Sequence, residues 1–306
     1  MNHFVNLLIQ EMNGIVHMAM PILIIAYVIP SAIANPYSSL IIAMIIAAWR
    51  VFLIYQQAKN EAVILKFEPT GEIRAELEEL VRSCGMNPAA INLRYRFVND
   101  MVAVTTFNLI GIDHMVWYGL ENDPQAMEAQ EIIQRIMAFS LTPEQIENLT
   151  KIKQFLSPAA QRFIFRHELG HVYYQYTYKK LISVGLIITL FAYAGIRLGY
   201  SLYPTLGVFA ILVAIVAAGV LDIALSYVSN YFFKTWAEKY ADEFAARYSN
   251  AEEILAAADF FERYQEIIDT ARKPWGIVAK LPNSLLAGYP ETPVRVAYLR
   301  GIAATK

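Results

Sequence analysis

Four long apolar runs constrain this chain more than any other feature of its sequence. They cover about residues 15–34, 38–55, 181–200 and 205–233, and each is near or above the ~18–20 residues that span a bilayer. Of the 306 residues, 57% are hydrophobic and only 17% are charged, a balance outside the usual range for soluble domains. We therefore predict a multi-pass membrane protein with four transmembrane helices. Buried core helices of a large soluble protein are the alternative.

Two short polar links divide the runs into hairpins. Asn35-Pro36 breaks the first pair and Ser201-Leu202-Tyr203-Pro204 breaks the second. The first run lacks a basic leader and is followed at once by another run, so we predict a retained span and not a cleaved signal peptide. Lysines gather on the side opposite to these links: Lys59, Lys66, Lys179, Lys180, Lys234 and Lys239. By the positive-inside rule, both termini and both polar regions face the cytoplasm.

The polar segments predict a catalytic domain built from two separated parts of the chain. We expect a transmembrane hairpin over 1–55, a cytosolic α+β part over 56–180, a second hairpin over 181–233 and a cytosolic helical part over 234–306. Periodicity and turn signals predict helices over 72–84, 124–139, 143–156 and 236–248, strands over 91–98, 102–107 and 113–118, and further helices that start at Ser157-Pro158, at a capping box of Ser249 with Glu252, and at Val294. The fold class is therefore mainly α, with a small α+β domain outside the membrane.

One short motif, "RHELGH" at residues 166–171, carries the chemistry. His167 and His171 are four residues apart, so both imidazoles project from one helix face and can bind a single metal ion. Glu168 lies beside the first histidine, where it can take a proton from a zinc-bound water that attacks a peptide carbonyl. This H-E-x-x-H pattern is a known signature of metalloproteases. A pair of histidines that is merely structural is the alternative.

A catalytic zinc site requires a third protein ligand. No other histidine belongs to a supporting motif, but the helix predicted over 236–248 contains Glu238 and Asp242 one turn apart. Glu238 can bind the metal while Asp242 orients a ligating histidine. Taken alone, such a pair is more typical of a solvated helix face, so the interpretation depends on the zinc motif. It predicts one zinc ion per chain.

At these residues the chain resembles the membrane zinc endopeptidases that include HtpX-type heat-shock proteases and CAAX prenyl endoproteases. The resemblance rests on "HELGH" at 167–171 and "EKYAD" at 238–242, and on the order of spans and polar regions along nearly the whole chain. It is closest to the HtpX type. It implies a gluzincin-like catalytic domain with zinc ligands His167, His171 and Glu238, and with Glu168 as general base.

The chain departs from this family near its C-terminus. Where the family commonly has H-P-x-x-x-x-R, Arg295 matches the arginine but Tyr289 replaces the histidine. A tyrosine hydroxyl can still donate a hydrogen bond to an oxyanion, so we keep both residues as catalytic candidates.

Proteases of this type pair an edge strand with the extended substrate, and the run 113–118 is our candidate for that strand. Its substrate-binding residues would be His114, Met115, Val116 and Trp117, with an ordinary half-buried strand as the alternative.

Two other functions fit parts of the sequence. Leu221-Asp222 in the fourth run resembles the intramembrane aspartate of site-two-type zinc proteases, although Ile223 stands where that family has glycine. A non-catalytic membrane scaffold is the second alternative.

For the favoured reading, the expected partners are the lipid bilayer and polypeptide substrates, either misfolded membrane proteins or a specific processing substrate. The net charge of −2 and the lack of a basic cluster give no reason to expect a nucleic-acid partner. The oligomeric state stays open.

Overall fold

The structure is a computed structural model that describes residues 34–64, 67–96, 103–113, 116–117, 119–120, 123–137, 143–207, 209–210, 212–214, 216–217, 233–272 and 291–306. The chain divides into two compact units. The first takes its described parts from residues 1–58 and 179–232, and the second from residues 59–178 and 233–306.

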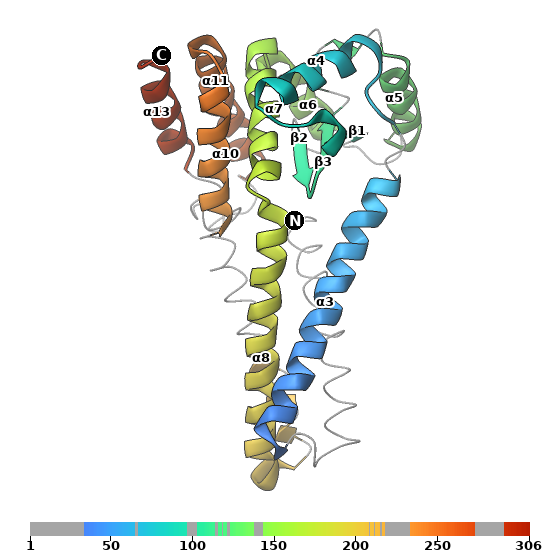
Figure 1. The fold of residues 1–306 in the computed structure, drawn as a ribbon, viewed down its shortest axis with the longest axis vertical. Helices are drawn as coiled ribbons and strands as arrows, with labels where there is room; N and C mark the ends of the chain where they lie inside the picture. Colours follow the sequence, from blue (N-terminus) through green and yellow to red (C-terminus); the bar gives the residue numbers. More distant parts are fainter. Residues whose placement is uncertain are drawn as a thin grey trace. The chain divides into compact units, whose positions relative to one another are not determined.

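Two long apolar helices, α3 (Pro36–Ile64) and α8 (Tyr176–Leu206), dominate the first unit (Figure 1). By length and composition, Pro36–Gln56 and the whole of α8 are suited to cross a bilayer. Small and branched side chains of the two helices form one buried cluster, made of Ala43, Ile46, Ala47, Ile188, Ala192 and Ile196. Two of the four predicted spans thus correspond to described helices. The run 15–34, apart from its last residue, and most of the run 205–233 lie outside the described residues.

The predicted break at Ser201–Pro204 is wrong, because α8 continues through these residues to Leu206. Pro204 lies in the last turn of α8, so its missing N–H removes one backbone hydrogen bond close to the helix end and leaves the body of the helix intact. The helix ends instead at Gly207, which has a φ of +54° and donates its N–H to the Tyr203 carbonyl at 2.8 Å. A glycine in the left-handed region is a common end to a helix.

The second unit is built around α7 (Pro158–Tyr173), which is buried along most of its length. On one side it packs against α10 (Thr235–Tyr248) and α11 (Ala251–Arg272), with α13 (Thr292–Ala303) against α11. On the other side lie the sheet and α4 (Gly71–Ser83), as Figure 1 shows. The predicted helix at Ser157-Pro158 is confirmed, since the Ser157 hydroxyl accepts the Ala160 N–H at 3.1 Å and Pro158 opens the first turn.

The sheet has three strands in the order β1-β3-β2: β1 (Asn92–Arg96), β2 (Ala103–Thr106) and β3 (Leu109–Asp113). Strand β3 pairs parallel to β1 and antiparallel to β2, so β2 is an edge strand of this sheet, and it faces α7. The strand predicted over 113–118 is wrong. The strand runs over 109–113 at the centre of the sheet, and Val116 and Trp117 follow it outside any strand. Gly111 lies between two of the predicted strands, but it pairs with Arg94 and Val104 inside β3.

The remaining helices are α5 (Pro124–Met137) and α6 (Pro143–Phe155), which agree with the predicted ones to within two residues, and the short helix η1 (Pro88–Ala90). The capping box of α11 lies one residue later than predicted. The Asn250 side chain accepts the Glu253 N–H at 2.9 Å, and the Glu253 carboxylate accepts the Asn250 N–H at 3.2 Å. Ser249 and Asn250 are both good capping residues, and Ser249 makes a different contact that is described below.

Candidate metal centre

The "HELGH" residues lie in the second half of α7, where the helix is buried on all sides. His167, Glu168 and His171 are 5%, 7% and 8% exposed. The two imidazole rings are perpendicular, with their centroids 4.8 Å apart. Their common helix face therefore holds two nitrogen donors close together in a site from which bulk water is largely excluded.

Helix α10 approaches this face unusually closely because Gly170 has no side chain. A Cβ placed on Gly170 would lie 2.9 Å from the Ala241 Cα and 3.1 Å from the Phe244 Cβ. This approach brings Glu238 between the two histidines. One of its carboxylate oxygens lies 3.2 Å from the His167 Nε2, and the other lies 3.6 Å from the His171 Nε2.

Two carboxylates compete for the place of third metal ligand. The possible ligand atoms of His167, Glu168 and His171 all lie within 4.8 Å of one another. Glu238, however, has one oxygen directed at each imidazole, whereas a carboxylate oxygen of Glu168 accepts a hydrogen bond of 2.7 Å from the Thr105 hydroxyl. We favour Glu238 as the ligand, because its two oxygens face both nitrogens and Glu168 remains beside them.

Asp242 and Arg295 extend the site behind His167. The His167 Nδ1 lies 2.8 Å from an Asp242 oxygen, so an Nδ1–H there leaves the Nε2 lone pair directed toward Glu238. Arg295, on α13, binds both Asp242 oxygens at 2.7 Å. Its guanidinium also lies over the Phe261 ring, 3.7 Å from the centroid. Asp242 is therefore held in place by a bidentate contact, and Arg295 acts on the site through it.

The electrostatics of the site follow from this arrangement. Burial alone would lower the pKa of His167, but the nearby Asp242 and Glu238 carboxylates outweigh burial and raise the pKa to about 10. Burial also opposes the charge on Glu238, yet its contact with His167 lowers the pKa of Glu238 to about 2. For Asp242, Arg295 is the largest of the factors that overcome burial and lower the pKa to about 2. Burial lowers the pKa of His171.

These residues fit a divalent cation such as zinc. Two imidazole nitrogens and one carboxylate are the donors that catalytic zinc sites use. Of the three buried carboxylates, Glu168, Glu238 and Asp242, the described part of the chain pairs Asp242 with a guanidinium, that of Arg295. A buried excess of negative charge is costly unless a cation compensates it. In the metal-free site a proton on His167 supplies part of that compensation, and a divalent metal would supply it in full.

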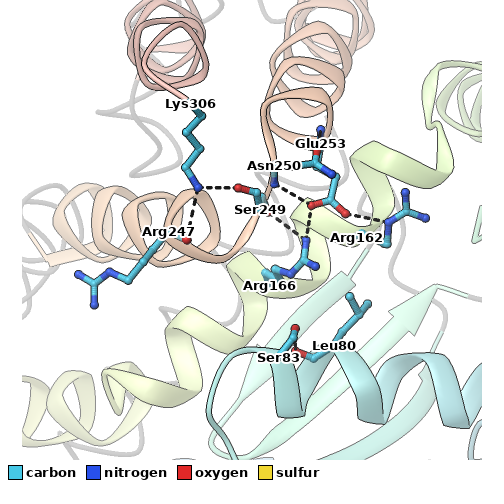
Figure 2. A network of polar contacts seen from close by, with 9 residues as sticks. All are labelled: Leu80, Ser83, Arg162, Arg166, Arg247, Ser249, Asn250, Glu253 and Lys306. Atoms are coloured by element: carbon cyan, nitrogen blue, oxygen red, sulfur yellow. Dashed lines mark hydrogen bonds and ion pairs between the residues drawn. The ribbon is translucent and has the colours of Figure 1, made fainter.

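A polar network anchors the N-terminal part of α7 (Figure 2). The buried Glu253 carboxylate binds Arg166 at 2.6 Å and Arg162 at 2.8 Å, and Arg166 also donates to the Ser249 hydroxyl at 3.1 Å. Lys306 donates to the main-chain carbonyl of Ser249 at 2.6 Å. These contacts join α7 to the junction of α10 and α11, and they account for the two arginines that flank the zinc motif on its N-terminal side.

The predicted site residues meet different outcomes in the structure. His167, Glu168, His171, Glu238, Asp242 and Arg295 converge, as described above. Tyr289, His114 and Met115 lie outside the described residues, as does Asp222 of the site-two alternative. Val116 and Trp117 are 0% and 3% exposed, and Trp117 packs against Phe165 with ring centroids 6.3 Å apart. These two side chains belong to the core, so neither presents a surface to a substrate.

Three residues near the site were not predicted from the sequence: Thr105, Gly170 and Phe261. Thr105 and Phe261 reach the site only through tertiary packing, and no local pattern marks them. Gly170 offered a signal, since a glycine inside a helix costs stability and often has a packing reason.

Comparison with known proteins agrees with this geometry. The chain matches the sequence model described as peptidase family M48 over residues 118–303. Neither a curated protein nor a solved structure gave a match. The matched region includes both zinc-motif histidines, Glu238, Asp242 and Arg295. The chain therefore belongs to peptidase family M48 and is a zinc metallopeptidase.

Proposed function

We propose that this protein is a membrane-embedded zinc endopeptidase whose ligands are His167, His171 and Glu238. The position of the Glu238 carboxylate, with one oxygen toward each imidazole Nε2, is the observation that carries the proposal. Zinc in such a site acts as a Lewis acid that lowers the pKa of water and polarises the scissile carbonyl.

The residues around the metal have separate tasks. Glu168, beside the ligands, takes a proton from the attacking water and delivers it to the leaving amine. Asp242 fixes the tautomer and orientation of His167, and Arg295 fixes Asp242. Tyr289 remains our candidate for a hydrogen bond to the oxyanion, on the basis of its place in the sequence.

The edge strand β2 replaces the run 113–118 as the proposed site of substrate binding. Strand β2 pairs only with β3 in the described sheet, and it lies beside α7. An extended peptide can add to such an edge by main-chain hydrogen bonds, which recognise many sequences. Binding of this kind suits an enzyme with varied unfolded substrates.

We propose a multi-pass protein with its catalytic unit and both termini in the cytoplasm. The two apolar helices suggest membrane association, and the lysine distribution favours this orientation. Chain connectivity adds support, because α8 begins five residues after His171. With so few residues between the metal ligand His171 and an apolar helix, we expect the site to act near the bilayer surface. Misfolded membrane proteins are the substrates expected there. Quality control is therefore the favoured role, with a specific processing substrate as the second candidate.

The test uses full-length protein purified in detergent, with zinc content and cleavage of an unfolded model protein as readouts. We expect Glu168→Gln to keep zinc and lose cleavage, and Glu238→Ala to lose both. Glu243→Ala is the matched control on α10, because Glu243 is partly exposed and pairs with the exposed Lys239 on the same helix. Loss of zinc in Asp222→Asn but not in Glu238→Ala would favour the intramembrane alternative. A wild-type protein without zinc or cleavage would favour the scaffold.

A further inference from the structure

The general base proposed above has one hydrogen-bond donor among the described residues. The Thr105 hydroxyl lies 2.7 Å from a carboxylate oxygen of Glu168 and 3.2 Å from its main-chain carbonyl oxygen. A hydroxyl has one proton to donate. The Glu168 carboxylate is the stronger of the two acceptors, because it is charged and lies closer than the main-chain oxygen. Thr105 thus contacts both the side chain and the main chain of the same residue, although the two residues are 63 positions apart.

The place of Thr105 in β2 makes this contact specific. Successive side chains in a strand point to opposite faces, so Thr105 shares a face with Ala103, and Val104 and Thr106 share the other. The Thr105 bond shows that its face is the one toward α7. Thr105 pairs with Ile110 of β3, and this pairing fixes the position of Thr105 in the sheet. The hydroxyl is therefore held by the sheet and not by a flexible loop.

We propose that Thr105 is a positioning residue that holds the Glu168 carboxylate in its catalytic orientation. This role rests on the proposed function, in which Glu168 moves the proton. A carboxylate with one oxygen fixed by a donor presents its other oxygen in a defined direction, which reduces the reorganisation needed for proton transfer.

The test compares Thr105→Val, which keeps the branched shape and removes the hydroxyl, with Thr105→Ser, which keeps the hydroxyl. We expect Thr105→Val to lower kcat by about 10- to 100-fold, with KM and zinc content close to wild type. Thr105→Ser should recover kcat to within about threefold of wild type. Thr106→Val is the control for the effect of a valine on the strand itself. The fold-loss of kcat in Thr105→Val must be about tenfold larger than the fold-loss of kcat in Thr106→Val.

A second readout does not depend on activity. Infrared difference spectra between wild type and Thr105→Val should show a shift of a carboxylate stretching band, because the carboxylate loses a donor. The same difference measured in a Glu168→Gln background should lack that band. Absence of the band in the first pair would overturn the proposed contact.

The outcomes separate this inference from the proposed function. Equal kcat in Thr105→Val and Thr106→Val, or parallel loss of zinc and activity in Thr105→Val and Thr105→Ser, would overturn the positioning role and leave the peptidase assignment intact. Absence of cleavage by the wild type would overturn the proposed function and the positioning role together.

Discussion

Replacement of Gly170 by alanine tests whether the close approach of α7 and α10 builds the metal site. The added Cβ would lie 2.9 Å from the Ala241 Cα, 3.1 Å from the Phe244 Cβ and 3.2 Å from the Ala241 carbonyl oxygen. Ordinary contacts between carbon atoms are roughly 3.5–4.0 Å, so the two helices must separate by about 0.6–1.1 Å to relieve the first contact. Two of the three nearest atoms are backbone, and they cannot rotate away.

The consequence for folding and the consequence for metal binding differ in size. Overpacking costs about 1–3 kcal/mol, while alanine in place of a helical glycine regains up to about 1 kcal/mol. We therefore expect a modest loss of about 0–2 kcal/mol in the free energy of unfolding. Metal ligands tolerate displacements of only about 0.2 Å, so Glu238 should be displaced beyond what zinc accepts. Zinc affinity should fall by roughly 10- to 100-fold.

Gly301→Ala is the matched control. Gly301 lies in α13, and a Cβ there meets no atom within 4 Å. This variant should be slightly more stable than wild type and should bind zinc equally well. The assays are a zinc competition titration and denaturant unfolding of the metal-free proteins in detergent. If Gly170→Ala binds zinc as tightly as wild type, the proposed role of this helix contact is wrong.

Three further predictions follow from the buried charges. Asp242→Asn should weaken zinc binding by about 10- to 100-fold in a competition titration, because a neutral amide with one acceptor oxygen replaces the carboxylate that serves both His167 and Arg295. Zinc affinity should rise about tenfold per pH unit between pH 6.5 and 8.5. The pKa of His167 in the metal-free site is raised to about 10, so one proton must leave when zinc binds. The same raised pKa means that the proton on His167 stabilises the metal-free fold fully below about pH 6.5, and that this stabilisation is lost as pH rises through about 10. A flat zinc affinity over this range would contradict the assignment. Glu253→Ala should cost about 3–5 kcal/mol in denaturant unfolding, because it leaves Arg166 buried without its carboxylate partner, while the exposed Glu252→Ala should change stability by less than about 0.5 kcal/mol.

The sequence predicted those parts of the site that depend on local spacing. A four-residue interval places His167 and His171 on one helix face, and the same interval relates Glu238 to Asp242. The start of α7 was also predictable, because a serine followed by proline is a strong helix-start signal. These features depend on neighbours within one or two turns, which a sequence displays directly.

The errors arose where tertiary structure decides between local alternatives. A glycine inside a strand weakens the local strand signal, so the prediction ended one strand before Gly111 and began the next after it, whereas pairing on both sides holds Gly111 in β3. Ser249 and Asn250 are both suited to cap α11, and Arg166 decides the choice by binding Ser249. Thr105 could not be predicted, because its contact with the base joins segments that are distant in the chain.

X-ray absorption at the zinc edge of the purified wild-type protein tests the central claim most directly. We predict one zinc per chain, with two imidazole nitrogens at about 2.0–2.1 Å, carboxylate oxygen at about 2.0–2.2 Å and no sulfur. Glu238→Ala, which we expect to lose zinc during purification, is reloaded with excess zinc to the wild-type occupancy; its spectrum should lack the carboxylate contribution and keep both imidazoles. A wild-type spectrum without zinc, or one that Glu238→Ala leaves unchanged, would contradict the proposed ligand set.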